Sequence, residues 1–294
     1  MRDIIDQLIE ERAGWLSRSG TGVAVARNVL RQMLGYERTV RIGERLAAMP
    51  GTEVMDTATR MFTRNVEATG LENLPTSGAF IITANHPTGI ADGLALYNAI
   101  APQRPDLFFF ANSDALRVFP QLDRYLAPVE WRKDKRGHRQ NRETMIYAHR
   151  AFKEGRPCIL FPSGRLAKRR GLRLHERPWM PSCAMLARKF ELPIVPLHIT
   201  ARNSLQFYLF DMIHPTLRDI TLFHEVLNKT RQPYRIKIGE PIDPATLPSG
   251  SVEATEVLRD ATLSLGGEVS GTQKLLRPSS GKRRSRLRPG RVGV

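Results

Sequence analysis

After Gly78 the chain changes from helical periodicity to short, uninterrupted apolar runs, each followed by a helical segment. The apolar runs lie at 79–83, 107–110, 158–161 and 194–199, and the helical segments at 92–100, 142–154 and 179–190. A continuous apolar run indicates a strand buried on both faces, and strands that alternate with helices form parallel sheets. The sequence therefore predicts an α/β fold with a largely parallel central sheet flanked by helices.

The segments on either side of this core predict further parts of the fold. Apolar residues spaced three to four apart predict helices over 1–70, interrupted at Met49-Pro50-Gly51, as an N-terminal helical layer. A helix is also expected over 217–227, and the alternation over 234–238 favours a strand near a sheet edge. We therefore expect four regions: an N-terminal helical region 1–65, an α/β domain 66–245, a C-terminal helical segment 246–270 and a disordered basic tail 271–294.

Basic residues outnumber acidic ones by 45 to 29, which gives a net charge of +16. Eight of the basic residues fall within 271–294, where no acid occurs, so half of the net charge remains on residues 1–270. Such an excess favours polyanionic partners, namely phospholipid headgroups, nucleic acid, or an anionic substrate or carrier. Charge alone does not choose among these three.

Cysteine usage and hydropathy indicate the compartment. Cys158 and Cys183 lie in apolar surroundings without metal-ligand spacing, so we expect two buried thiols and a reducing, cytoplasmic setting. Residues 1–16 carry four acids, which a signal peptide does not. The longest apolar stretch, 78–100, contains an Asn-His pair and an Asp, which a spanning helix would not tolerate. We therefore expect neither export nor a transmembrane helix.

The junction between the first predicted strand and its helix carries His86 and Asp92. Pro87 keeps His86 out of the helical conformation, whereas Asp92 falls at the start of the helix. A carboxylate bonded to one ring nitrogen fixes the tautomer and leaves the other nitrogen free to accept a proton from a hydroxyl. The alternative is an unremarkable loop His followed by a helix-capping Asp.

Two other predicted strands are also followed by basic residues, one of them after a turn. The turn Pro162-Ser163-Gly164-Arg165 follows the strand at 158–161, and further cations follow at 168–170 and 173. Backbone N–H groups and guanidinium groups in such a turn can bind a phosphate, although a solvated basic loop has the same pattern. The short apolar segment at 127–131 likewise ends in Arg132, and the apolar segment 192–197 fits a structural role.

Taken together, four blocks resemble the glycerolipid acyltransferase family, which includes bacterial lysophosphatidate acyltransferases. The blocks are Asn85-His86-Pro87-Thr88-Gly89-Ile90-Ala91-Asp92, a segment ending in Arg132, Phe161-Pro162-Ser163-Gly164-Arg165, and Ile194-Val195-Pro196-Leu197. The flanks Gly70-Leu71-Glu72-Asn73-Leu74-Pro75 and Ile238-Gly239-Glu240-Pro241-Ile242 are also similar to the family. The resemblance covers residues 66–245.

The first and third blocks depart from the usual family pattern. Five residues instead of four separate His86 from Asp92, which looks like a branch with a His-Pro-x-Gly-x-x-Asp-Gly motif in which Gly89 absorbs the extra residue. Ser163 stands where the family has Glu, and no Thr precedes Arg165. The serine is not part of a Gly-x-Ser-x-Gly hydrolase motif, and the chain contains neither a P-loop nor a zinc signature.

The resemblance implies transfer of an acyl group from acyl-CoA or acyl carrier protein to a hydroxyl of a lysophospholipid or related lipid precursor. His86 would be the general base and Asp92 would orient it, with no metal and no cofactor beyond the thioester co-substrate. The implied substrate-binding residues are Asn85, Arg132, Phe161, Pro162, Ser163, Gly164 and Arg165, while Pro196 belongs to the structural fourth motif. Arg132 and Arg165 would bind phosphate groups of the acceptor or donor.

We expect a cytoplasmic protein that is bound peripherally to the inner face of the cell membrane. Its expected partners are a lipid acceptor, an acyl thioester donor and an anionic membrane surface. No dedicated nucleic-acid partner is expected, and the oligomeric state stays open. The alternative is a catalytically idle basic module that binds anionic membrane or nucleic acid. The His86 and Asp92 pair favours the enzyme, because binding alone needs no such pair.

Overall fold

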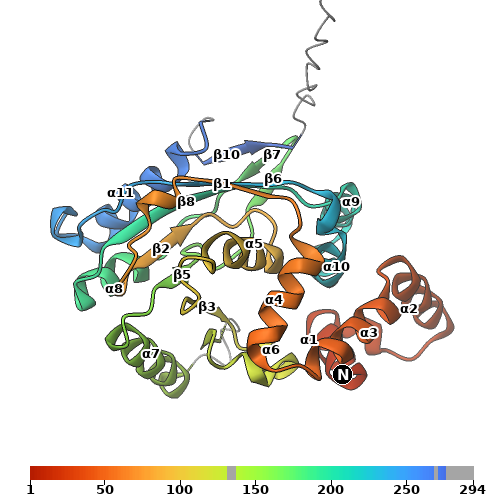
Figure 1. The fold of residues 1–294 in the computed structure, drawn as a ribbon. Helices are drawn as coiled ribbons and strands as arrows, with labels where there is room; N and C mark the ends of the chain where they lie inside the picture. Colours follow the sequence, from red (N-terminus) through yellow and green to blue (C-terminus); the bar gives the residue numbers. More distant parts are fainter. Residues whose placement is uncertain (131–136, 268–270, 276–294) are drawn as a thin grey trace, which may run out of the picture.

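The computed structural model describes residues 1–130, 137–267 and 271–275. Within these residues the main sheet has seven strands in the order β1-β9-β8-β2-β5-β3-β4 (Figure 1). The strands are β1 (Val66–Thr69), β2 (Ile81–Ala84), β3 (Phe108–Asn112), β4 (Leu126–Val129), β5 (Cys158–Leu160), β8 (Ile194–Thr200) and β9 (Tyr234–Ile238). Neighbouring strands run parallel except for β8 and β9, which are antiparallel. The predicted largely parallel central sheet is confirmed.

Helices cover both faces of this sheet because its central strands are apolar on both sides. Successive residues of a strand point to opposite faces, so Ile82 packs with Leu96 in one core cluster and Ile81 packs with Ala184 in the other. The first cluster lies under α4 (Gly51–Phe62) and α5 (Ile90–Ile100), and the second under α7 (His138–Lys153), α8 (Ser182–Phe190) and α11 (Ser251–Ser264). The predicted flanking helices are confirmed.

The N-terminal helices differ in how they contact the core. α4 packs into the main core through Val54 and Phe62, whereas α1 and α3 form a smaller cluster around Ile5 and Tyr36. α2 has no buried residue over its described length, and Figure 1 shows α2 and α3 extending away from the sheet. These helices are α1 (Arg2–Arg12), α2 (Thr21–Met33) and α3 (Tyr36–Ala47).

Residues 66–69, for which the sequence predicts helix, instead form the edge strand β1. Their side chains alternate between half-buried and exposed, which suits a strand with one solvent-facing side. β9 lies next to this edge strand, as the alternation in its sequence predicts. The remaining short elements are α6 (Asp114–Val118) and the 3-10 helices Gly14–Ser17, Leu71–Asn73, Pro120–Leu122, Lys229–Arg231 and Pro244–Thr246.

A second, smaller sheet is not predicted by the sequence. Its three strands are antiparallel and lie in the order β10 (Thr272–Lys274), β7 (Arg173–His175) and β6 (Lys168–Arg170). Leu174 and Leu275 on one side of it pack against Phe207 and Tyr208 of α9 (Leu205–Ile213), which leads into α10 (Pro215–Asn228). Residues 272–274 are therefore part of the fold rather than of a disordered tail, and the rest of that predicted tail, 276–294, lies outside the described residues.

Two smaller expectations concern thiols and membrane spans. Cys158 and Cys183 are both free and buried, as predicted, and burial raises the pKa of each thiol. In the described part of the chain, no helix has the length and apolar character needed to cross a membrane.

Candidate active site

His86 lies in the loop that leaves the carboxyl end of β2, and Asp92 lies in the first turn of α5. Gly89 adopts a φ of 102°, which favours glycine, and lets the chain turn into the helix. His86 Nδ1 is 2.9 Å from Asp92 Oδ2, so the two side chains form the expected pair. The imidazole keeps 19 % of its surface exposed, whereas the carboxylate is fully buried.

The Asp92 carboxylate is fixed by hydrogen bonds from the loop that it closes. Oδ2 accepts from the backbone N–H of Thr88 at 2.8 Å and of Gly89 at 3.0 Å, and Oδ1 accepts from the Thr88 hydroxyl. The buried Tyr234 hydroxyl lies 2.6 Å from the same Thr88 oxygen, and burial raises the Tyr234 pKa, so the phenol stays protonated and can donate. Asp92 therefore caps α5 and also orients His86, so the two sequence interpretations are compatible.

A buried polar network supports this loop from the side of β8. Asn203 Nδ2 donates to the Thr88 carbonyl at 3.3 Å, and Lys229 Nζ donates to Asn203 Oδ1 at 2.5 Å. The ammonium also lies 3.2 Å from Glu225 Oε2, and burial lowers the Lys229 pKa. No sequence pattern indicates this network, because its members belong to different elements.

The third sequence block lies directly against the first. The Phe161 ring stacks on the His86 imidazole, with ring centroids 4.2 Å apart and planes 25° from parallel. This contact follows from the fold, because β5 and β2 are parallel neighbours and both blocks leave the same edge of the sheet. The Ala167 N–H also donates to the His86 carbonyl at 2.9 Å. The structure thus places the Phe161 ring against the face of the imidazole and leaves 19 % of the His86 side chain exposed.

Glu176 is a site residue that the sequence analysis missed. Its Oε2 accepts from the His86 backbone N–H at 3.2 Å and its Oε1 from Trp179 Nε1 at 3.1 Å. Burial raises the Glu176 pKa, and these donors and the nearby Ser163 oppose the shift. Glu176 is the single acid in the sequence 164–178, which is the signal that could have found it.

The other residues of the third block form a tight turn. Pro162 and Ser163 are buried, and Ser163 Oγ donates to the Arg165 carbonyl at 2.8 Å. Gly164 has a φ of 58° and lies at the surface. Arg165 is exposed, and its guanidinium has no hydrogen-bond or ion-pair partner among the described residues. Burial and the charge of Arg165 lower the pKa of neighbouring Arg177.

The remaining predicted site residues have different positions. Asn85 is buried and joins β2 to β8, because Nδ2 donates to the Ile199 carbonyl at 2.9 Å and Oδ1 accepts from the Ile199 N–H at 2.7 Å. Pro196 lies inside the buried strand β8, opposite Thr83 of β2. Arg132 lies outside the described residues, so its expected convergence on His86 stays a prediction.

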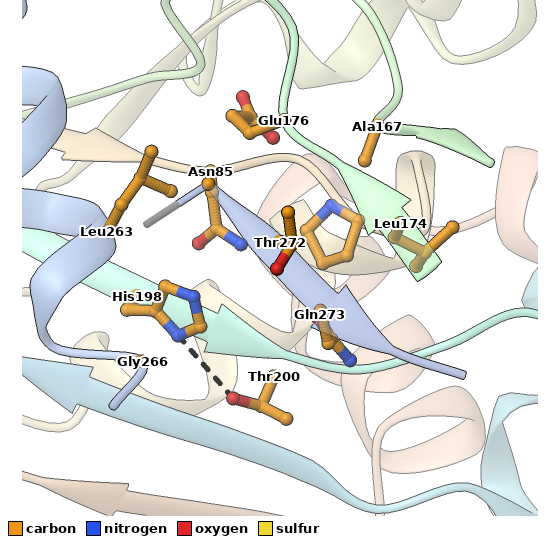
Figure 2. Close-up of a pocket in the computed structure, with 12 residues that line it drawn as sticks. Asn85, Ala167, Leu174, Glu176, His198, Thr200, Leu263, Gly266, Thr272 and Gln273 are labelled. Carbon is orange, nitrogen blue, oxygen red and sulfur yellow. Dashed lines mark hydrogen bonds between the residues drawn. The ribbon is translucent and has the colours of Figure 1, made fainter. Parts of the chain in front are cut away.

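A small hollow, partly open to solvent, lies beside the His86 loop and between the two sheets (Figure 2). Asn85, Pro87 and Glu176 line it on the loop side. His198 and Thr200 of β8 line it on the other side, with His198 Nδ1 3.4 Å from Thr200 Oγ1. Glu176 therefore separates this hollow from the backbone of His86.

Comparison with known proteins identifies the class. Residues 65–200, from β1 to the end of β8, match the family model described as Acyltransferase. Over these residues the chain is similar to the acyltransferase family, and the comparisons support a glycerolipid or lysophospholipid O-acyltransferase.

Within this class the chain is similar to two proteins named lyso-glycine lipid O-acyltransferase. The protein from Phocaeicola vulgatus is 26 % identical over 198 residues, which cover 65 % of this chain and 69 % of that protein. The protein from Bacteroides thetaiotaomicron is 23 % identical over 223 residues, covering 73 % and 80 % respectively. A solved structure, the 1-acyl-sn-glycerophosphate (LPA) acyltransferase PlsC from Thermotoga maritima, aligns over 91 % of this chain and 97 % of that one, with 18 % identity and a TM-score of 0.48.

Proposed function

We propose that this chain transfers a fatty acyl group from a thioester donor to a hydroxyl of a lysolipid, with His86 as general base. The observation that carries the proposal is the 2.9 Å contact between His86 Nδ1 and the buried, fourfold-bonded Asp92 carboxylate. With the hydrogen on Nδ1 donated to Asp92, Nε2 is left to accept a proton. The lysolipid acceptor is supported by the names of the two relatives.

In the proposed reaction the acyl group passes directly from the donor to the acceptor. Nε2 of His86 takes the proton of the acceptor hydroxyl while its oxygen attacks the thioester carbonyl, so a C–O bond forms and the C–S bond breaks. The leaving thiolate then takes the proton from the imidazolium, which the Asp92 charge has stabilised. The stacked ring of Phe161 limits rotation of the imidazole, so Nε2 keeps one direction.

Arg165 is the proposed contact for anionic groups of the substrates. It follows the turn that carries Phe161, and its guanidinium is exposed without a partner in the described chain. An arginine can bind phosphate through two parallel hydrogen bonds, each charge-assisted bond contributing about 1.5–3 kcal/mol. Either the acceptor headgroup or the phosphates of the donor, acyl-CoA or acyl carrier protein, fit this role. We propose a cytoplasmic, peripheral location on the inner membrane face.

The test incubates the purified chain with mixed lysolipids and labelled acyl-CoA or acyl carrier protein, and identifies the product by mass spectrometry. We expect one labelled diacyl product, lost with His86→Ala and kept with His149→Ala, a control on the exposed surface of α7. Arg165→Lys should raise KM, because an ammonium cannot make both bonds. A folded chain that forms no product with any lysolipid, yet binds anionic vesicles or nucleic acid, would favour the idle binding module.

A further inference from the structure

The turn between β6 and β7 exposes an apolar side chain among cations. Leu172 follows the turn residue Gly171 and is 64 % exposed. It stands between Arg170 and Arg173, which face each other across the hairpin. A single exposed apolar residue is common on protein surfaces, so Leu172 matters here only together with the cations and the apolar helix end that lie beside it.

The same small sheet has one strongly basic side. The register places Arg170 opposite Arg173 and Arg173 opposite Lys274, and it places Lys168 opposite His175. Like charges directly opposite each other destabilise a sheet. Lys168 and Arg170 are exposed and have no ion-pair partner in the described ranges. This arrangement is therefore suited to an external anionic surface.

The C-terminal end of α9 lies beside this hairpin. Arg169 Nε of β6 is 3.5 Å from Asp211 Oδ2 of α9, and Phe207 and Tyr208 pack beneath the small sheet. Beyond this contact the helix exposes Met212 at 64 % and Ile213 at 69 %. Asp211, the acid of this helix, also pairs with Arg218, so the exposed apolar end carries no uncompensated negative charge.

The described chain also ends at the hairpin tip. Leu275, its last described residue, donates its N–H to the Leu172 carbonyl at 3.0 Å. The sequence that continues from there, 276–294, contains seven Lys or Arg and no acid. The basic extension is thus attached where the apolar tip and the cations already meet.

We propose that this end of the molecule, named here the docking end and made of residues 168–173 and 209–213, binds the anionic leaflet of a membrane. The proposal rests on the proposed function, since it supplies the membrane contact from which a lysolipid would enter. The docking end is also joined directly to the site: Ala167, just before β6, bonds to His86, and Asn203, just before α9, bonds to Thr88. A leaflet at this end thus lies next to the elements that position the general base.

The exposed side of α2 fits this role less well. It presents Val25, Val29 and Met33, but its arginines are used inside the protein. Arg27 donates to the Leu16 carbonyl and Arg31 pairs with Asp6 at 3.1 Å. An apolar face without available cations lacks the electrostatic attraction that anionic lipids supply.

The test measures sedimentation of the full chain with vesicles of phosphatidylcholine alone or with added phosphatidylglycerol. One variant, L172D/M212D, changes the apolar residues, and its control, M185D/V252D, changes residues of 58 % and 59 % exposure on α8 and α11. A second variant, K168E/R170E, reverses the charge of two basic residues. Its control, R139E/R150E, makes the same change on the exposed surface of α7. Turnover of a short-chain, water-soluble lysolipid is measured with L172D/M212D.

We expect K168E/R170E to weaken binding to the anionic vesicles by roughly tenfold or more, since each cation near such a surface contributes about 1 kcal/mol. L172D/M212D should weaken it by at least about fivefold, with turnover of the soluble lysolipid unchanged, and both controls should bind like the wild type. If both docking variants bind the vesicles like the wild type, or if the controls lose as much binding as the docking variants, the proposed docking end is wrong. A chain that shows the expected binding but acylates no lysolipid supports the docking end and removes the proposed function.

Discussion

Asp92 illustrates how one residue can serve both the fold and the proposed chemistry. Its carboxylate closes the turn at Gly89 and Thr88 and, with the same oxygen, contacts His86. The spacing in the sequence was sufficient to predict the His86 and Asp92 pair, because a strand-to-helix turn is local. It was insufficient for Glu176, which reaches the His86 backbone across 90 residues of chain; only the fold brings these two together.

We predict that His86→Ala lowers kcat by about 10²–10⁴-fold, the usual contribution of a general base. Asp92→Asn should lose most activity while keeping the loop, because the amide oxygen can still accept from Thr88 and Gly89 but carries no charge to stabilise an imidazolium. Steady-state kinetics of variants with native circular dichroism measure both effects. A folded His86→Ala protein with near-normal kcat would contradict the role of His86.

Glu176 gives a prediction about pH. Burial raises its pKa above the ordinary 4.5, so the folded state binds a proton that the unfolded state releases. The stability that this group contributes is therefore present below its ordinary pKa and is lost as the pH rises through the raised value. Glu176→Gln should remove this part of the pH dependence. Urea denaturation of both proteins across the acidic to neutral range measures the difference, and identical pH slopes would be inconsistent with it.

At the scale of elements, apolar runs predicted the buried strands and the flanking helices. The β6 and β7 strands escaped prediction because their cations favour a solvated loop, whereas the packing of Leu174 against α9 decides the structure. β1 escaped because four alternating residues are too short a pattern. Tertiary contacts overrode local preference in both cases.

We predict that Gly89→Ala destabilises the β2–α5 connection more than Gly78→Ala does. Both glycines have a positive φ, 102° and 76°, so either alanine costs about 1–3 kcal/mol of backbone strain. An added Cβ at Gly89 would also lie 3.2 Å from Leu166 and 3.3 Å from Leu222, whereas Gly78 has open space. Gly89→Ala should therefore lose more free energy of unfolding and also lower kcat, because the turn orients Asp92. Equal losses in urea denaturation would remove this argument.

At the scale of the whole molecule, the net charge of +16 divides equally between residues 1–270 and residues 271–294. The main sheet has an apolar core, whereas exposed cations of the small sheet, Lys168 and Arg170, lie near the point from which the basic sequence after Leu275 continues. Net charge predicted an anionic partner but not its place. The proposed place, the docking end, depends on the pairing of β6, β7 and β10, which no local pattern revealed.

The last prediction concerns residues 276–294. A deletion that ends the chain at Leu275 keeps β10 and removes seven cations, so it should weaken sedimentation with anionic vesicles while turnover of a detergent-dispersed substrate stays unchanged. The binding that remains should depend less on salt, because the Debye length falls from about 8 Å at physiological ionic strength to about 3 Å at 1 M, and exposed cations lose most of their attraction. The control replaces the seven cations with Gln at full length and should behave like the deletion, because charge rather than length is removed. Unchanged vesicle binding in both variants would assign attachment to the folded docking end or to the N-terminal helices.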